Sequence, residues 1–217
     1  MRGALTLREI SDQPTAWQDA IRRFERDAAL VDRLFERCLP DEVIFTGCGS
    51  SYYLSMTAAS VFQQVTGLRA KAVPASEILQ FPEGVFAQEA AVLLVASSRS
   101  GTTTETLRAV RSAARQGIPT LALTCAGDSP MAKLADLALV SPRGAERSVV
   151  MTKSFSSLLL LGLLLAAQRS GDARFRRELS RLPTLGKRVI KLALPLMRDI
   201  GIAASRVVFL GAGPMHG

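Results

Sequence analysis

The segment VIFTGCGSS at residues 43–51 decides the fold, because an apolar, strand-like run passes directly into a turn of glycines and serines. A second segment, VLLVASSRSGTT at residues 92–103, has the same build. Each is followed by a helix-forming stretch, so each loop offers free backbone N–H groups, hydroxyls and the positive end of a helix dipole at one point. That chemistry suits a phosphate group.

Strands, loops and helices alternate through the middle of the chain. Apolar runs predict five strands, at residues 43–46, 70–74, 92–96, 120–124 and 137–140. Helical patterns follow at residues 51–66, 76–80, 103–116, 130–134 and 153–169. Unbroken apolar strands between amphipathic helices are typical of a parallel sheet that is buried on both faces. With right-handed crossovers, the sequence predicts an α/β fold, a three-layer αβα sandwich with both loops at the carboxyl edge of the sheet.

A long amphipathic helix is predicted before the first strand. Apolar residues recur at helical spacing over residues 17–35. Pro14 suits a first helical turn, with Ser11 or Asp12 as the cap, and Pro40 suits the end of the helix. The sheet is therefore expected to follow an N-terminal helical extension.

The C-terminal part repeats the opening pattern in weaker form. Residues 174–202 read as helical, with breaks expected near Pro183 and Pro195. The run RVVFL at residues 206–210 then enters a glycine loop, as residues 42–51 do. This repeat predicts the first strand and loop of a second, incomplete domain. The expected parts are an extension (1–40), a first domain (41–171), a helical linker (172–204) and the beginning of a second domain (205–217).

Composition bounds the class of protein. The formal net charge of +8 suits an anionic ligand. Nucleic acid is not expected, because Lys and Arg are scattered and only two Tyr and one Trp could stack on bases. The apolar run at residues 158–167 is shorter than the ~20 residues that span a bilayer, so a buried helix is expected and no membrane partner.

The cysteines and the N-terminus point to the cytoplasm. The three cysteines are odd in number and lack the spacing of a zinc site or a redox pair, so reduced thiols are expected. The N-terminus has no apolar run of the kind that a signal peptide carries. His, Cys and Asp do not cluster with ligand spacing, so neither a metal nor an organic cofactor is predicted.

The hydroxyl groups of the two loops are the candidate phosphate ligands, and Gly101 lets the backbone approach closely. We assign phosphate binding to Ser50, Ser51, Ser98, Arg99, Ser100 and Thr103. The alternative is that these residues only cap helices, but two such loops on neighbouring strands favour a ligand. Neither loop has the Gly-Lys-Ser/Thr ending of a P-loop, and the first lacks the third glycine of a dinucleotide site.

Three segments resemble the sugar isomerase (SIS) domain family: EVIFTGCGSSYY at residues 42–53, VLLVASSRSGTTTET at 92–106 and ERSVVMTKSF at 146–155. The opening REISDQPTAW, at residues 8–17, is similar to the helix that precedes the first SIS domain in tandem members. The resemblance implies a flavodoxin-like domain that binds a hexose 6-phosphate, and a dimer, since related sites lie between subunits. FLGAGPMHG, at residues 209–217, looks like the start of a second SIS domain.

The resemblance also implies roles for individual residues. It aligns Ser51, Ser98, Ser100 and Thr103 with hydroxyls that hold the sugar 6-phosphate. It matches Val149 and Met151 to the stretch that lines the sugar side, and we assign Cys48, Gly49 and Lys153 to the same side. The glucosamine-6-phosphate synthases commonly have a small polar residue at the position of Met151. They often have Gln at the position of Arg99 and Glu at the position of Thr102. The differences at Arg99 and Thr102 point away from the synthases and toward the related deaminases and isomerases.

The catalytic groups are less well defined. In tandem members, the glutamate that moves a proton between C1 and C2 and the ring-opening histidine lie in the second domain. Within this chain, Glu146 is the best-placed carboxylate, and His216 is the single histidine. We expect a phosphosugar isomerase or amino-sugar-phosphate deaminase. A non-catalytic sugar-phosphate sensor would need the same loops, although the first 40 residues do not resemble the helix-turn-helix of SIS-containing regulators.

Overall fold

The computed structural model describes residues 3–86, 90–203, 205–206, 208 and 211–215. Five parallel strands form one sheet in the order β2-β1-β3-β4-β5. The strands are β1 (Glu42–Gly47), β2 (Arg69–Pro74), β3 (Val92–Ser98), β4 (Thr120–Thr124) and β5 (Leu137–Val140). The predicted α/β sandwich is thus confirmed, and each strand lies within two residues of its predicted bounds.

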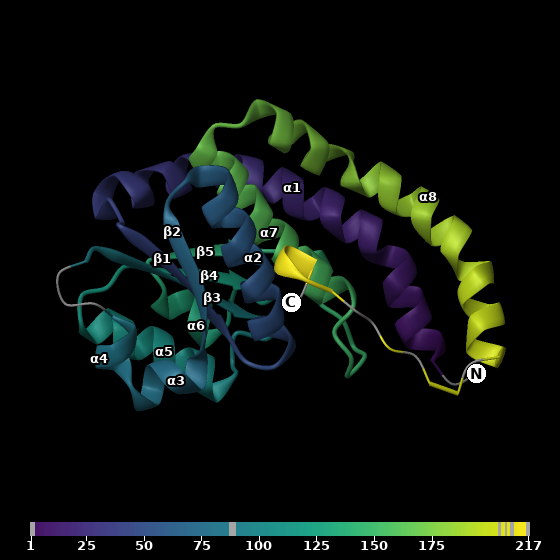
Figure 1. The fold of residues 1–217 in the computed structure, drawn as a ribbon, viewed down its shortest axis with the longest axis horizontal. Coiled ribbons are helices and arrows are strands. Elements are labelled where there is room, and N and C mark those ends of the chain that lie inside the picture. The colour runs from purple at the N-terminus through teal and green to yellow at the C-terminus, as the bar shows by residue number, and fades with distance from the viewer. Residues whose placement is uncertain (1–2, 87–89, 204, 207, 209–210, 216–217) are drawn as a thin grey trace.

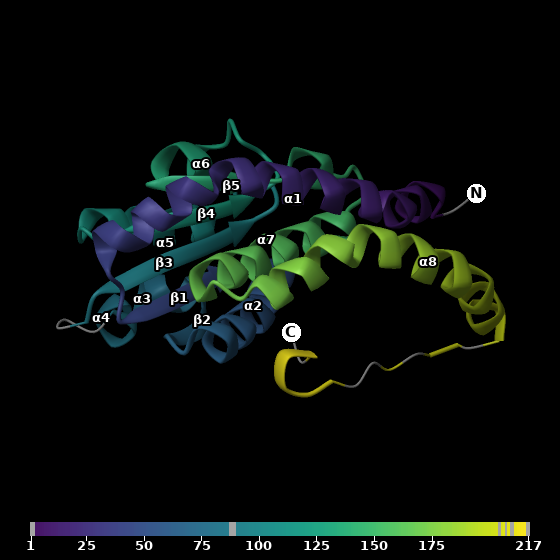
Figure 2. The same cartoon turned by 90° about the horizontal axis from the view of Figure 1, so that it is seen from above.

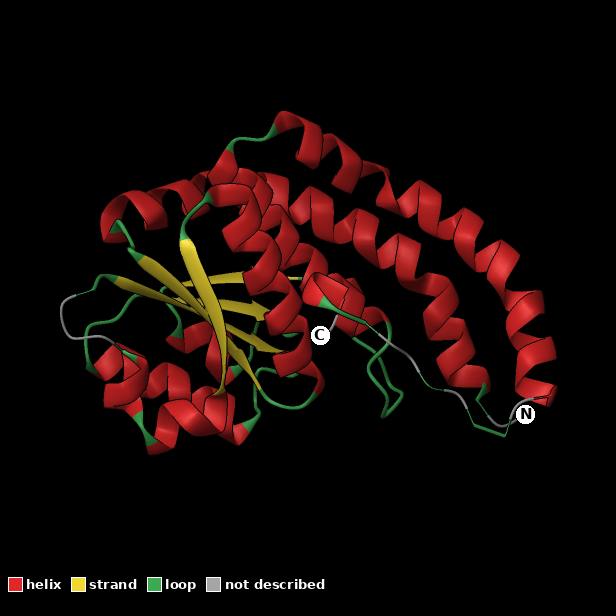
Figure 3. Cartoon of the chain, viewed as in Figure 1, coloured by secondary structure: helices red, strands yellow, loops and turns green. Residues whose placement is uncertain are grey.

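Helices cover both faces of the sheet (Figure 3). The helices are α1 (Ala4–Cys38), α2 (Ser50–Thr66), α3 (Ala75–Gln80), α4 (Pro82–Val85), α5 (Thr104–Arg115), α6 (Pro130–Leu134), α7 (Lys153–Ser170) and α8 (Ala173–Ala203), with 3-10 turns η1 (Pro142–Gly144) and η2 (Gly213–Met215). Figure 1 shows α1, α2 and α7 on one side of the sheet and α3, α5 and α6 on the other. The short helix α4 was not predicted.

The core follows the alternation of side chains along the strands. On β1, Phe45 packs with α1, α2 and α7, whereas its neighbour Ile44 faces α3 and α5. Every residue of β3 is buried, as expected for a central strand of a parallel sheet. The apolar run on α7 is a core helix as predicted, with Leu158 and Leu165 fully buried. Truncating either leucine to Ala is expected to cost about 2–5 kcal/mol. In the part of the chain that is described, no helix combines the length and hydropathy needed to cross a membrane.

Helix α1 begins earlier than predicted. It starts at Ala4, so Pro14 lies inside the helix and neither Ser11 nor Asp12 is the cap. A proline there leaves the carbonyl of Ile10 without its usual N–H partner. The side-chain amide Nε2 of Gln13 donates to that carbonyl at 3.1 Å and replaces the missing bond. The helix therefore continues through the proline.

Helix α8 also runs through its prolines. The predicted breaks near Pro183 and Pro195 are wrong, because one helix spans Ala173–Ala203. Figure 2 shows α8 lying along α1 and α7, and packing there offsets the backbone bonds that the prolines remove. Gly186 makes close approach possible, since a Cβ at this position would collide with the ring of Trp17. Trp17 in turn donates Nε1–H to Ser156 Oγ of α7 at 2.9 Å.

The strand expected at residues 206–210 lies mostly outside the described residues. Of residues 206–210, Val207, Phe209 and Leu210 lie outside the described residues, and the described Arg206 and Val208 have no strand assignment. The turn η2 lies against α2, where Thr57 Oγ1 donates to the carbonyl of Pro214 at 2.7 Å (Figure 2).

Candidate functional site at the carboxyl edge of the sheet

The two hydroxyl-rich loops lie on neighbouring strands. β1 and β3 pair in parallel with Thr46 opposite Ala96, so both loops leave the same edge of the sheet. Each loop enters the N-terminus of a helix, α2 after the first and α5 after the second. Thr106 Oγ1, in the first turns of α5, donates to Cys48 Sγ of the first loop at 3.5 Å. The structure thus brings the two predicted phosphate loops together.

The first loop is a tight turn whose shape depends on glycine. A Cβ at Gly47 would lie 2.7 Å from the carbonyl carbon of Ser51, so only glycine fits there. Gly49 has φ of +52°, in the region that side chains avoid. The turn lets α2 begin directly at Ser50, and it buries Ser51 while leaving Ser50 exposed. The N–H groups of Ser51, Tyr52 and Tyr53 donate within this turn, to the carbonyls of Cys48 and Gly49 at 2.9–3.2 Å, so backbone hydrogen bonds close the first loop.

The second loop is held in shape by its own hydroxyls. Ser98 Oγ accepts from the Gly101 N–H at 3.1 Å and lies 3.1 Å from Thr103 Oγ1. Ser100 Oγ accepts from the Thr102 N–H at 3.2 Å and from its hydroxyl at 2.8 Å. Gly101 has φ of +63°, and a Cβ there would collide with Ser129, the cap of α6. The loop is preorganised, with Ser98 buried and Ser100 exposed.

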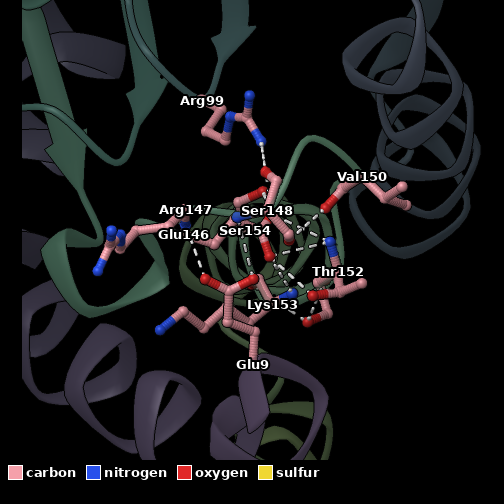
Figure 4. A network of polar contacts seen from close by, with 10 residues as sticks. Glu9, Arg99, Glu146, Arg147, Ser148, Val150, Thr152, Lys153 and Ser154 are labelled. Carbon is pink, nitrogen blue, oxygen red and sulfur yellow. Dashed lines mark hydrogen bonds and ion pairs between the residues drawn. The ribbon is translucent and has the colours of Figure 1, made fainter. Parts of the chain in front are cut away.

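Arg99, a predicted phosphate ligand, directs its side chain toward the segment that precedes α7. Its Nη1 donates to the carbonyl of Ser148 at 3.2 Å and lies 3.9 Å from Glu146 Oε1 (Figure 4). The side chain therefore links the second phosphate loop to the segment that precedes α7. That segment carries the predicted sugar-side residues.

Glu146 lies beneath the N-terminus of α7. Its buried carboxylate accepts from the N–H groups of Thr152 at 3.0 Å and Lys153 at 3.1 Å, and from the Thr152 hydroxyl at 2.7 Å. The hydroxyl of Ser154 donates to it as well. A carboxylate at this place satisfies free N–H groups and interacts favourably with the helix dipole. The geometry shows a capping role for this candidate base.

The sugar-side residues have different surroundings. Val149 is 92% exposed at the tip of the loop, whereas Met151 packs against the main core. Lys153 Nζ pairs with Asp12 Oδ2 of α1 at 3.1 Å, so its cation already has a partner. Cys48 and Gly49 lie in the first loop as predicted, and His216 lies outside the described residues.

Glu9 is the residue that sequence reasoning missed. It belongs to the second turn of α1 and is 5% exposed. Its Oε1 accepts from the Arg147 N–H at 2.6 Å, and its Oε2 accepts from the Ser148 N–H at 3.3 Å. Burial tends to raise its pKa, but hydrogen bonds from Ser148 and Arg147 and the charge of Lys153 outweigh burial, so the pKa lies below its ordinary value.

The two cysteine thiols whose pKa is shifted, Cys38 and Cys125, are not reactive centres. Desolvation, and secondarily the charge of Glu146, raise the pKa of Cys125 to about 12. Burial also raises the pKa of Cys38. Both thiols remain protonated near neutrality, and a protonated thiol is a poor nucleophile and metal ligand. Within the described ranges, no three His, Cys, Asp or Glu side chains are grouped as metal ligands.

Comparison with known proteins identifies the family. The model of the SIS domain matches residues 40–168, which include all five strands and both loops. The chain belongs to the SIS domain family. The matched region begins after α1 and ends near the C-terminus of α7, so Glu9 lies outside the part that the family model covers.

Several SIS proteins are similar over most of this chain. A glutamine–fructose-6-phosphate aminotransferase (isomerizing) from Mycolicibacterium smegmatis is 32% identical over 94% of this chain and 35% of its own length. The crystal structure of glucosamine-6-phosphate deaminase from Thermotoga maritima is 36% identical, with a TM-score of 0.65 over 83% of this chain and 54% of that one.

A third comparison supports the fold alone. The crystal structure of tagatose-6-phosphate ketose/aldose isomerase from Escherichia coli is 22% identical, with a TM-score of 0.85 over 98% of this SIS chain and 60% of that one. Its high TM-score extends the agreement to α1 and α8, which flank the SIS domain. In each of these comparisons, the chain spans between a third and three fifths of the relative's length.

Proposed function

We propose that this SIS chain binds a hexose 6-phosphate, and an amino-hexose in particular, at the carboxyl edge of its sheet. The observation that carries the proposal is the pairing of two preorganised hydroxyl loops on β1 and β3, each at a helix N-terminus. Backbone N–H groups and hydroxyls in that arrangement are suited to phosphate oxygens. Similar proteins are named for fructose 6-phosphate and glucosamine 6-phosphate, which supports the same class of ligand.

The phosphate ligands proposed are Ser50, Ser51, Ser98, Ser100 and Thr103, with Arg99 acting beside them through its guanidinium or its backbone. The sugar ring would extend toward the loop at residues 147–151. In this position it would meet Val149 and Met151, while Cys48 and Gly49 would line the opposite side. Lys153 would contribute positive charge to the sugar side while it remains paired with Asp12.

The reaction proposed is aldose–ketose isomerisation or deamination of an amino-sugar phosphate. Isomerisation moves a proton between C1 and C2 and leaves the composition unchanged, so it needs a base and a group that opens the ring. Glu146 already accepts hydrogen bonds from Thr152, Lys153 and Ser154, which favours a fixed carboxylate over a proton carrier. We therefore place the base in a second SIS domain, of which residues 205–217 would be the start.

A sensor remains the second candidate, and the bonding of Glu146 is the observation that favours it. Among the described residues, the site presents groups that hold a phosphate, while its buried carboxylate is engaged in capping. A protein with those features binds its ligand without converting it. Incubating the 217-residue chain, and a longer chain that continues past Gly217, with glucosamine 6-phosphate or tagatose 6-phosphate separates the two candidates. Ketose formation and ammonia release are followed for the first substrate and aldose formation for the second. Turnover by either chain supports the enzyme, and binding without turnover by both supports the sensor.

Titration calorimetry tests the binding site itself. The 217-residue chain is titrated with glucosamine 6-phosphate, galactosamine 6-phosphate, fructose 6-phosphate, the free sugars and inorganic phosphate. Binding of phosphorylated but not free sugars is expected, with a loss of about tenfold or more in Ser51→Ala and Thr103→Ala, because a hydrogen bond to a charged group is worth about 1.5–3 kcal/mol. Ser180→Ala, an exposed serine on α8, is the control. Equal losses in all three variants would contradict the proposal.

Assembly and location are further proposals. We propose that the protein is a cytoplasmic homodimer, with the domain limits at residues 40, 171 and 204 given by the sequence. Light scattering at several concentrations tests the dimer, and a mass equal to one chain at all concentrations would contradict it.

A further inference from the structure

The loop at residues 147–151 depends on polar anchors from other parts of the chain. Val149 and Val150 at its tip are 92% and 63% exposed, so the tip has little apolar packing of its own. A polar cavity of about 360 Å³ lies beside the loop. It is lined by Arg8, Glu9, Asp12, Ala145, Glu146, Arg147 and Lys153. Hydrogen bonds must therefore set the shape of the loop.

Within the loop, Ser148 Oγ donates to the carbonyl of Val150 at 3.0 Å. Three side chains from outside the loop supply further hydrogen bonds, and Figure 4 shows how they surround the loop. Glu146 holds the C-terminal end, through the N–H groups of Thr152 and Lys153. Arg99 holds the middle, through the carbonyl of Ser148 at 3.2 Å. Glu9 holds the N-terminal end, through the N–H groups of Arg147 and Ser148.

Glu9 differs from the other two anchors in its origin. Glu146 is six residues from Thr152, and Arg99 belongs to the neighbouring phosphate loop. Glu9 comes from α1, which is 138 residues away from Arg147 in sequence. Its carboxylate is buried, and both oxygens are engaged with the loop backbone. Burying a charge is costly unless hydrogen bonds satisfy it, and here the loop backbone provides them.

We propose that Glu9 is a positioning residue for the sugar side of the site, an inference that rests on the function proposed above. Glu9 acts through Arg147 and Ser148, and it orients the Val149–Met151 segment toward the sugar. Its hydrogen bonds go to neither of the phosphate loops, at residues 47–51 and 98–103. It therefore affects how the sugar is bound while leaving the phosphate subsite intact. By this assignment α1 is a functional part of the binding site.

Two substitutions test the assignment. Glu9→Gln keeps the size of the side chain but replaces one acceptor oxygen by an NH2 group that faces a backbone N–H. Glu9→Asp keeps the charge and both oxygens on a shorter stem. Glu36→Gln, an exposed glutamate on the same helix, is the matched control. Circular dichroism establishes that each variant is folded.

The binding readout is the ratio of two affinities. The Kd of the 217-residue chain for the preferred hexose 6-phosphate is expected to rise about tenfold in Glu9→Gln, the effect of losing one hydrogen bond to a charged group. It is expected to recover in part in Glu9→Asp, and to stay unchanged in Glu36→Gln. The Kd for inorganic phosphate is expected to change less than about twofold, because no contact to the phosphate loops is lost.

Hydrogen exchange provides a readout that needs no ligand. Peptides that cover residues 146–152 are expected to exchange faster in Glu9→Gln, whereas peptides covering residues 47–51 and 98–103 keep their rates. Equal weakening of sugar phosphate and inorganic phosphate, or an unchanged exchange rate at residues 146–152, would overturn the role of Glu9 and leave the proposed function standing. If the wild-type chain binds neither phosphorylated sugars nor inorganic phosphate, the proposed function and the inference are overturned together.

Discussion

The proposed phosphate side and the proposed sugar side of the site are built in different ways. On the phosphate side, residues that are two to five positions apart bond to one another, as Ser98 does with Gly101 and Thr103. On the sugar side, a short loop is held by Glu9 of α1 and by Arg99 of another loop. The first subsite is local and the second is assembled by the fold. Substitutions on the phosphate side should therefore act directly, and those on the sugar side should act through packing and long-range bonds.

The largest effect is expected from Gly101→Ala on the phosphate side. The new Cβ collides with Ser129 and also faces a φ of +63°, so we expect a loss of about 2–4 kcal/mol in the free energy of unfolding. Phosphate binding should be lost with it. Chemical denaturation and calorimetry measure the two effects.

Gly117→Ala is a control that has the backbone strain of Gly101→Ala without its steric collision. Gly117 has φ of +72°, but a Cβ there meets nothing within 4 Å. This control is expected to cost only about 1 kcal/mol and to keep phosphate binding. If the two variants lose the same stability, the contact with Ser129 has no role in shaping the loop.

The next largest effect is expected from Glu146→Gln on the sugar side. The change removes the charge that caps α7 and leaves part of its hydrogen bonding unsatisfied, at a cost of about 2 kcal/mol. Thermal unfolding measures the loss, and Glu105→Gln, an exposed glutamate in the first turn of α5, is the control. A Glu146→Gln variant with full stability but no turnover would instead favour Glu146 as the catalytic base.

Acid should weaken the sugar side through Glu9. The pKa of Glu9 in the folded chain lies below its ordinary value. The ionised carboxylate therefore stabilises the fold at pH values above the pKa of the unfolded chain, and this contribution is lost as the pH falls through the pKa of the folded chain. Between pH 5 and the acid limit, the Tm of the wild type should fall more than that of Glu9→Gln. Thermal unfolding followed across this pH range measures the difference. Parallel Tm curves would mean that Glu9 is not specifically stabilised as a carboxylate.

The smallest effect is expected from Arg99→Gln. Arg99 links the phosphate side to the sugar side. Arg99 is partly exposed and lies 3.9 Å from Glu146, so its loss should cost less than about 1 kcal/mol of stability. Its hydrogen bond to Ser148 is also lost, so the Kd for a hexose 6-phosphate should rise more than the Kd for inorganic phosphate. The reverse order would assign the guanidinium to the phosphate, as the sequence predicted.

Most of the fold could be predicted from the sequence because its signals are local. β4 and β5 were predicted at their observed bounds, since each is an apolar run between turn residues. The two hydroxyl loops were recognised for the same reason. Pro14 and Pro183 were misleading, because local rules place a proline at a helix end, whereas Gln13 and the packing of α8 on α1 compensate for the missing bonds.

By itself, the sequence determined the αβα sheet, the order of loops along it and the two hydroxyl-rich loops at its carboxyl edge, to which we assign phosphate binding. These follow from periodicity and from residues that are close neighbours in the chain. The tertiary structure alone decided the direction of Arg99 and the contact of Glu9 with a loop 138 residues away. These contacts join segments that are distant in the sequence, and a pattern of nearby residues does not contain that information.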